Sequence, residues 1–184
     1  MSSRNEIDLM AHLMRRAGFG ATRQKLEELA ARPYEDVVED LLHPDRFPEV
    51  EEALLERYFG FDPVVGIFWI YRMVASPRQL EEKISLFWHH VFATGRAKSE
   101  HIHSMHRQLA MFRRVGLSDV RTILTALSMD PAMLFWLDNN ENFKGEPNEN
   151  YGRELLELFS MGVGNYTEDD IKGASRAFTG WTFR

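Results

Sequence analysis

Hydrophobic residues recur at helical spacing along most of the chain. Between Asn5 and Arg16, Ile7, Met10 and Leu13 recur at intervals of three residues, as on one face of a helix. The same kind of pattern predicts further helices over Thr22–Ala31, Pro33–Leu42, Glu51–Phe59, Val64–Ala75, Glu149–Met161 and Glu168–Phe178. No alternating pattern is long enough to indicate a strand. We therefore expect an irregular all-α assembly of about nine helices.

Helix start signals divide the middle of the chain. Ser76 is a good N-cap and Pro77 suits the first turn, so a helix is predicted near residues 76–93, which we expect to be central. Its apolar side is set by Leu80, Ile84, Phe87 and Val91. The preceding helix, 64–75, is apolar on nearly all sides, and this pattern predicts that it is buried.

Capping residues mark three further starts. Thr22, Asn148 and Thr167 each precede a predicted helix and carry the side-chain oxygen that N-caps use. Asp130 and Pro131 together indicate the start of another helix. Gly162 or Gly164 is expected to end the helix that begins after Asn148.

The stretch "ENYGRELLE" gathers charge on one side of its predicted helix. Glu149, Arg153 and Glu157 are spaced by four residues and fall on one arc, with Glu154 beside them. One interpretation is a solvated ladder of ion pairs, each worth roughly 0.2–0.5 kcal/mol. The other is the wall of an active site.

The stretch "LFWHHVF" places two histidines in an apolar helical turn. His89 and His90 need hydrogen-bond partners there, because a buried polar group without one costs roughly 1–3 kcal/mol. The carboxylates of residues 149–157 are candidate partners. Three alternatives stay open for such a pair: a structural ion pair, a general acid/base, or a metal site.

Composition excludes several classes of function. The 184 residues suit one domain, 44% are hydrophobic, and a net charge of −6 disfavours nucleic acid. No apolar run approaches a membrane span, and no secretory signal is visible, so the chain as written reads as cytoplasmic. Without cysteine there is no thiolate catalysis or cysteine-bound metal.

Other candidate chemistry is weaker. His101, His103 and His106 could share a metal, but histidines at a helix start are usually solvated. A haem pocket with His89 as axial ligand stays open. "RRAGFGAT" follows a helix rather than a strand, which argues against a phosphate loop, and no nucleophile elbow occurs.

Several longer motifs carry a family resemblance. "AHLMRRAGFGAT", "EEKISLFWHHVFATG", "DPAMLFWLDNNENFKGEPNENYGRELLELFSMGVGNYTEDDI" and "SRAFTGWTF" resemble, in order and spacing, the bacterial family named domain of unknown function 1800. The resemblance runs from about residue 10 to the C-terminus and implies no settled activity. Family members are usually longer and often exported. The resemblance therefore implies that residues 1–184 are the N-terminal portion of a longer protein, with its C-terminal part or self-association as the expected partner.

Two functional hypotheses follow. The first is an enzyme-like or cofactor-binding domain in which His89 is a general base or metal ligand, Glu149, Glu154 and Glu157 are carboxylate partners, and Arg153 is an orienting or anion-binding group. A divalent metal would be held by His89, His90 and Glu157. The family motif commonly has its second histidine where this chain has Val91, which weakens a two-histidine metal site. The alternative is a non-catalytic structural or interaction module, in which the same residues form a buried polar network.

Overall fold

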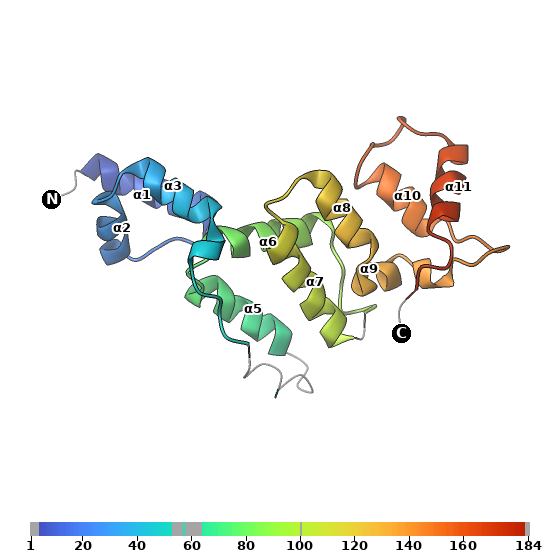
Figure 1. Ribbon diagram of the computed structural model, residues 1–184, viewed down its shortest axis with the longest axis horizontal. Coiled ribbons are helices and arrows are strands. Elements are labelled where there is room, and N and C mark those ends of the chain that lie inside the picture. The colour runs from blue at the N-terminus through green and yellow to red at the C-terminus, as the bar shows by residue number, and fades with distance from the viewer. Residues whose placement is uncertain (1–3, 53–56, 58–63, 100, 183–184) are drawn as a thin grey trace. The chain divides into compact units, whose positions relative to one another are not determined.

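A computed structural model of the chain describes residues 4–52, 57, 64–99 and 101–182. These residues form helices and no strand, which confirms the all-α expectation. The helices are α1 (Arg4–Ala17), α2 (Arg23–Ala30), α3 (Tyr34–Leu42), α5 (Val64–Ala75), α6 (Gln79–Val91), α7 (Ile102–Val115), α8 (Val120–Ser128), α9 (Pro131–Trp136), α10 (Asn150–Glu157) and α11 (Glu168–Ala177), with the 3₁₀ turns η1 (Pro44–Arg46) and η2 (Asn139–Glu141) (Figure 1). Most of the helix expected over 51–59 lies outside the described residues.

The chain divides into two compact units. Unit 1 comprises residues 1–87 and unit 2 comprises residues 88–184, so α6 contributes to both. The expectation of a single domain over 1–184 stays a prediction. Each unit has its own interior, and the two interiors are built differently.

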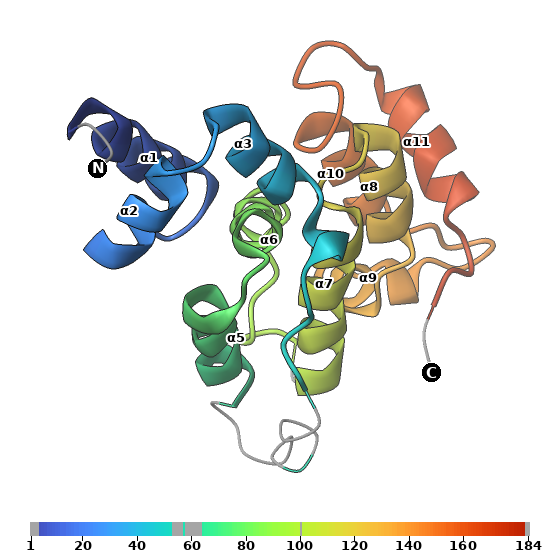
Figure 2. The same ribbon diagram turned by 60° about the vertical axis from the view of Figure 1, so that its left-hand side comes forward.

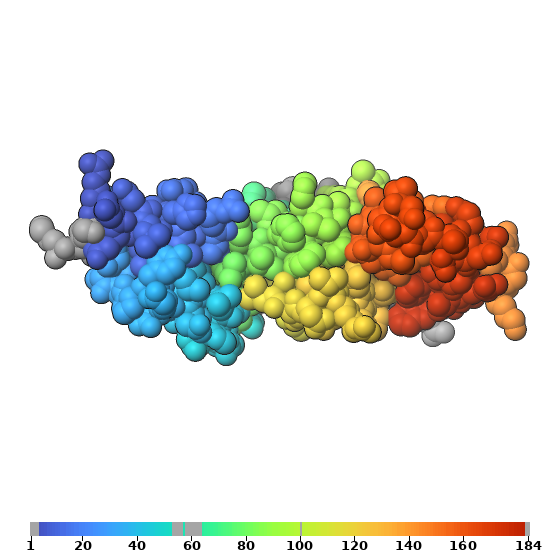
Figure 3. Space-filling view, turned by 90° about the horizontal axis from the view of Figure 1, so that it is seen from above, coloured from blue at the N-terminus to red at the C-terminus, as the bar shows by residue number. Residues whose placement is uncertain are grey.

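In unit 1, α1, α2 and α3 enclose a small apolar core. Ile7, Met10 and Met14 of α1 pack with Leu29 of α2 and Val37 of α3. The blue surfaces of these three helices adjoin one another in the space-filling view (Figure 3). Thr22 accepts a hydrogen bond from the Lys25 backbone N–H and begins α2, as the sequence predicts.

The other helices of unit 1 bury the opposite faces to those expected. In α5 the buried residue is Arg72, while the helix exposes apolar side chains. In α6 the buried residues are Glu81, Glu82 and Ser85, whereas Phe87 and Val91 are exposed. The prediction of a buried α5 is therefore wrong, because a charged contact joins the two helices, and the predicted apolar side of α6 is partly exposed. Figure 2 shows α5 beside α6.

Unit 2 has the larger apolar core. Phe112 of α7, Ile123 and Leu127 of α8 and Met133 of α9 are fully buried and pack with Phe92. Asp119 and Asp130 cap α8 and α9 by accepting backbone N–H bonds, and Pro131 occupies the first turn of α9.

The last two helices form a tightly packed pair. α10 packs against α11, and Gly152 of α10 lies where an added Cβ would come within 2.7 Å of the Ser175 hydroxyl oxygen of α11. Thr167 and Asp170 make a reciprocal capping box that begins α11. Only a glycine at position 152 allows this approach.

Two expected helix starts are corrected. The Ser76 hydroxyl accepts the backbone N–H of Arg78, and α6 begins later, at Gln79. The Asn148 side chain likewise accepts the backbone N–H of Asn150, where α10 begins. α10 ends at Glu157, four residues before the expected end.

Candidate functional site

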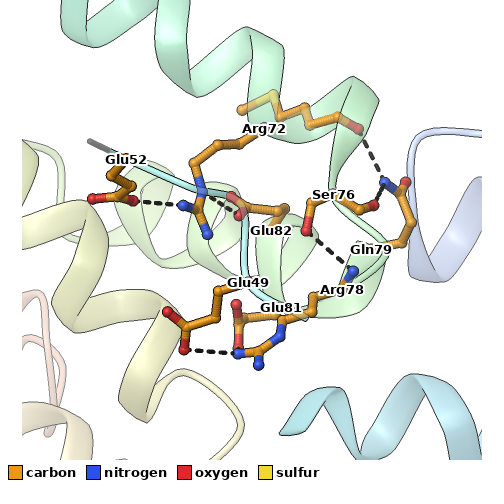
Figure 4. A network of polar contacts seen from close by, with 9 residues as sticks. Glu49, Glu52, Arg72, Ser76, Arg78, Gln79, Glu81 and Glu82 are labelled. Carbon is orange, nitrogen blue, oxygen red and sulfur yellow. Dashed lines mark hydrogen bonds and ion pairs between the residues drawn. The ribbon is translucent and has the colours of Figure 1, made fainter. Parts of the chain in front are cut away.

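A buried ion pair joins α5 to α6. The Arg72 Nε donates to a Glu82 carboxylate oxygen at 2.6 Å, and Arg72 Nη1 donates to Glu52 at 2.5 Å. Arg72 is only 4% exposed and Glu82 is 0% exposed. Burying two charges is unfavourable unless they are paired closely, so this contact requires the two helices to be held in one register (Figure 4).

A second arginine extends this polar interior. Arg78 donates from Nε and Nη2 to the backbone carbonyl of Phe47 and pairs with Glu49 and Glu81. The Gln79 amide donates to the carbonyls of Met73 and Ser76, close to the end of α5 (Figure 4). Polar contacts therefore fix both ends of the α5–α6 connection.

The outward face of α5 is apolar. Ile67, Ile70, Tyr71 and Val74 are all more than half exposed, with Ile70 at 64% and Val74 at 80%. Their spacing of three, four and seven residues places them on one stripe of the helix. A solvated helix face normally carries charge, whereas Arg72 is the single charged residue of α5 and points inward. We call these four residues the α5 face.

A second polar cluster lies in unit 2 around Gln108 of α7. Its amide nitrogen donates to Asp130 at 2.8 Å, and its carbonyl accepts the Thr94 hydroxyl at 2.6 Å. His89, near the end of α6, also hydrogen-bonds with Gln108. Gln108 is 0% exposed, so this cluster ties α6, α7 and the start of α9 together in the interior of unit 2.

Burial changes the pKa values of this cluster. It raises the pKa of Asp130 to about 6, against the opposing hydrogen bonds from the Met133 backbone and Gln108. It lowers the pKa of His89, against the hydrogen bond with Gln108. Burial also raises the pKa of Tyr151 to about 12, and the Tyr151 hydroxyl donates to Ser128 at 2.7 Å.

The raised pKa of Asp130 predicts a specific pH dependence of stability. Because the folded state holds this proton more tightly than the unfolded state, its stabilising contribution is present at low pH and is lost as pH rises through about 6. Relative to Asp130→Asn, the wild-type protein should lose roughly 1 kcal/mol of unfolding free energy between about pH 5 and pH 7. Urea titrations at a series of pH values measure this difference.

Asp119→Asn is the matched control for this measurement. Asp119 also caps a helix, but its pKa is lowered, mainly by the hydrogen bond from the Thr122 backbone, so its stabilising effect is lost only in acid. His89 acts in the opposite sense to Asp130, since its lowered pKa gives a contribution that is lost as pH falls below about 6.5. Equal profiles for wild type and Asp130→Asn would contradict the prediction.

The charged side of α10 is directed largely to α11 and the segment that precedes it. Arg153 donates from both terminal nitrogens to the Glu168 carboxylate, at 3.0 and 2.9 Å, and pairs with Glu149 at 3.3 Å. The Glu157 carboxylate accepts the Tyr166 hydroxyl at 2.7 Å. The predicted pair of Glu149 with Arg153 is present, and Glu168 is the partner that helical spacing did not indicate.

The predicted metal ligands do not lie together at one site. Among the described residues, no three His, Asp or Glu side chains come together in a way that could hold a metal ion. His89 bonds with Gln108, His90 is exposed, and Glu157 bonds with Tyr166. A metal or haem role for these residues, and a catalytic role for His89, Glu149, Arg153, Glu154 and Glu157, stays a prediction.

Asparagines of the long motif hold the loop before α10. The buried Asn139 donates to the carbonyls of Phe178 and Trp181, and Asn142 donates to the Ser175 carbonyl. The Asn142 oxygen accepts the backbone N–H of Asn148. These contacts join the asparagine-rich loop to the Thr-Gly-Trp segment, two parts of the chain that the family resemblance includes.

Helical spacing alone missed three buried polar residues of the two polar clusters. Arg72, Glu82 and Gln108 were not among the predicted site residues. A usable signal exists for Arg72, because a lone charge in a 12-residue apolar helix needs a buried partner. Gln108 gives no such signal, since glutamine is mostly found on exposed helix faces.

Three hollows lie away from the predicted site. One hollow of about 800 Å³ is in unit 1, and two of about 580 and 430 Å³ are in unit 2. None of the three is lined by His89, His90, Glu149, Arg153, Glu154 or Glu157. No helix among the described residues is long and apolar enough to cross a bilayer.

These features define an all-helical protein with charged contacts inside and an apolar helix face outside. The chain belongs to the family described as "Protein of unknown function (DUF1800)", whose model matches residues 12–184. This match confirms the resemblance seen in the sequence motifs. Comparisons with curated proteins and with solved structures found no match.

Proposed function

We propose that the protein is a non-catalytic interaction module that binds another protein surface through the α5 face. This proposal rests on one observation: α5 and α6 bury the charged side chains of Arg72 and Glu82 and expose apolar side chains to solvent. A free-standing surface helix gains stability from the opposite orientation. The arrangement is favourable when a partner covers the exposed face.

A second copy of the chain is the partner that best suits this face. The protein has a net charge of −6, so two copies repel one another over most of their surface. The α5 face carries no charge, and a helix stripe of this kind can pair with itself about a two-fold axis. Two copies would thereby cover the apolar side chains without bringing like charges together.

The expected dimer is weak. A 12-residue helix is about 18 Å long, and its exposed stripe is about 10 Å wide. This area is small compared with the roughly 1,200–2,000 Å² that stable interfaces bury in total. We therefore expect association that depends on protein concentration in the micromolar range rather than a permanent dimer.

Sedimentation velocity over a range of concentrations tests the proposal. Wild-type protein should associate as concentration rises, and Ile70→Glu should stay monomeric, because it places a charge in the middle of the α5 face. Val120→Glu is the matched control: it replaces a comparably exposed apolar residue of α8, outside the face, and should associate like wild type.

If the wild-type protein stays monomeric, binding of a hydrophobic dye shows whether the α5 face is available to a different partner. A monomer that binds dye at the α5 face, with binding lost in Ile70→Glu, would mean that the face serves a different protein partner. A wild-type monomer with no dye binding would contradict the interaction module. A loss of association in Val120→Glu as well would show that the effect is not specific to α5.

An acid–base role in unit 2 is the second candidate. It is supported by the pKa of about 6 for Asp130, which shares the Gln108 cluster with His89, whose own pKa is lowered by burial. The interaction module is preferred because Gln108 is fully buried and the predicted catalytic residues line none of the three hollows.

A further inference from the structure

Unit 1 contains a hollow that the interaction surface does not require. It has a volume of about 800 Å³ and lies between the α1–α3 bundle and the end of α5. Much of its wall is apolar, with side chains from Met14, Phe19, Leu29, Val37, Leu41 and Phe47. Ile70, at the centre of the α5 face, is not part of the lining, although Val74 is.

One part of the lining is cationic. Lys25 of α2 and Arg32 of the turn that follows α2 line the hollow together with Asp40 of α3. The Asp40 carboxylate accepts a hydrogen bond from Arg32 at 2.6 Å and forms an ion pair with Arg46 at 3.6 Å. Two arginines therefore contact one carboxylate. The Arg32 guanidinium beside Asp40 is the main cause that lowers the pKa of that carboxyl group, which is therefore ionised and already neutralised.

Arg32 retains hydrogen-bonding capacity toward the hollow. A guanidinium has five N–H donors, and within the described part of the chain Arg32 uses one of them, from Nη2 to Asp40. Its side chain is 44% exposed, so the remaining donors are accessible. Guanidinium groups bind carboxylates especially well because the two planar groups match in geometry.

The size of the hollow distinguishes between a peptide helix and a small molecule. An α-helix with side chains is about 10–12 Å across, so each turn fills roughly 500 Å³. The hollow would therefore hold fewer than two turns, too little for helix-in-groove binding. Its volume instead falls within the range of about 300–1,000 Å³ that is typical of small-molecule sites.

We propose that this hollow binds a single-chain aliphatic carboxylate, with its chain along the apolar wall and its carboxylate on Arg32. The apolar side chains exclude water from the chain, and Arg32 with Lys25 compensates the charge of the head group. This site shares Val74 with the α5 face, but it does not include Ile70 and does not rest on the interaction module proposed above.

Calorimetric titration of the full chain with dodecanoate, below the concentration at which dodecanoate aggregates, tests the proposal. We expect saturable binding of one molecule per chain. Arg32→Gln should weaken binding about tenfold or more, because it removes a charge-assisted hydrogen bond. Dodecan-1-ol, which has the same chain and a neutral head group, should bind wild type correspondingly more weakly than dodecanoate.

Arg23→Gln is the matched control, since Arg23 is a nearby arginine at the start of α2 that pairs with Glu27 and does not line the hollow. It should bind dodecanoate like wild type. Ile70→Glu should also bind normally, so failure of the interaction module leaves this result unchanged. Absence of saturable binding to wild type, or equal binding by the Arg32→Gln and Arg23→Gln variants, would overturn the proposal.

Discussion

Replacement of Arg72 by methionine should lower the free energy of unfolding by about 3–5 kcal/mol, as for other buried pairs that lose one partner. The reason is that Glu82 is fully buried and would keep its charge without the guanidinium that now donates to it at 2.6 Å. Methionine fills much of the same space, so the loss would come from the unpaired carboxylate rather than from a cavity. Urea unfolding at neutral pH measures the effect.

A double-mutant cycle identifies the pair as the cause. Glu82→Leu alone should also be destabilising, whereas Arg72→Met combined with Glu82→Leu should recover a large part of the loss, since no buried charge then remains without its partner. Arg23→Met is the surface control: its pair with Glu27 is exposed and should contribute less than about 1 kcal/mol. Additive losses in the double mutant would contradict this account.

Replacement of Gly152 by alanine should destabilise unit 2 by about 1–3 kcal/mol, although alanine is the better helix former. The added methyl group would lie 2.7 Å from the Ser175 hydroxyl oxygen and 2.9 Å from the Ser175 backbone nitrogen. The second of these atoms belongs to the α11 backbone, so α10 and α11 would have to move apart. Thermal and urea unfolding both report this change.

Gly173→Ala provides the opposite expected result on the neighbouring helix. No heavy atom lies within 4 Å of a Cβ added at Gly173, so alanine there should stabilise the protein by about 1 kcal/mol through helix propensity alone. Two identical substitutions on paired helices should therefore change stability in opposite directions. Equal effects would show that the close approach of α10 to Ser175 is not a real constraint.

The Arg72 result also bears on the proposed interaction. Arg72 lies on the inward side of α5, and Ile70 lies on the outward side. Arg72→Met should therefore reduce stability without placing a charge on the α5 face, whereas Ile70→Glu should abolish association with little effect on stability. The two substitutions separate the interior contact from the surface that it leaves exposed.

Several helix starts could be predicted from the sequence, because they depend on hydrogen bonds between residues close together in the chain. Thr22, Asp130 and Thr167 begin helices as expected, because an N-cap needs only its own side chain and a backbone N–H three residues away. Ser76 and Asn148 also bond to nearby backbone, but within turns that precede the helix. Capping residues therefore identified the breaks correctly and misplaced two boundaries, that of α10 by one residue and that of α6 by two or three.

The candidate site was predicted only in part. The i,i+4 pair of Glu149 with Arg153 follows from helical spacing and is present. Glu168 and Tyr166, the partners of Arg153 and Glu157, come from the segment around the start of α11, and spacing within α10 gives no information about them. His89 was expected to need a polar partner and has one in Gln108, a residue of α7 without a distinctive sequence signal.

The sequence by itself determined the helical class, the family and most helix starts, because these depend on periodicity and on contacts within a few residues. Only the tertiary structure decided which face of α5 and α6 is buried. The apolar stripe favours one orientation, and the pairing of Arg72 with Glu82 across ten residues favours the other. That choice depends on two charged groups meeting in the interior, where an unpaired charge costs far more than an exposed isoleucine.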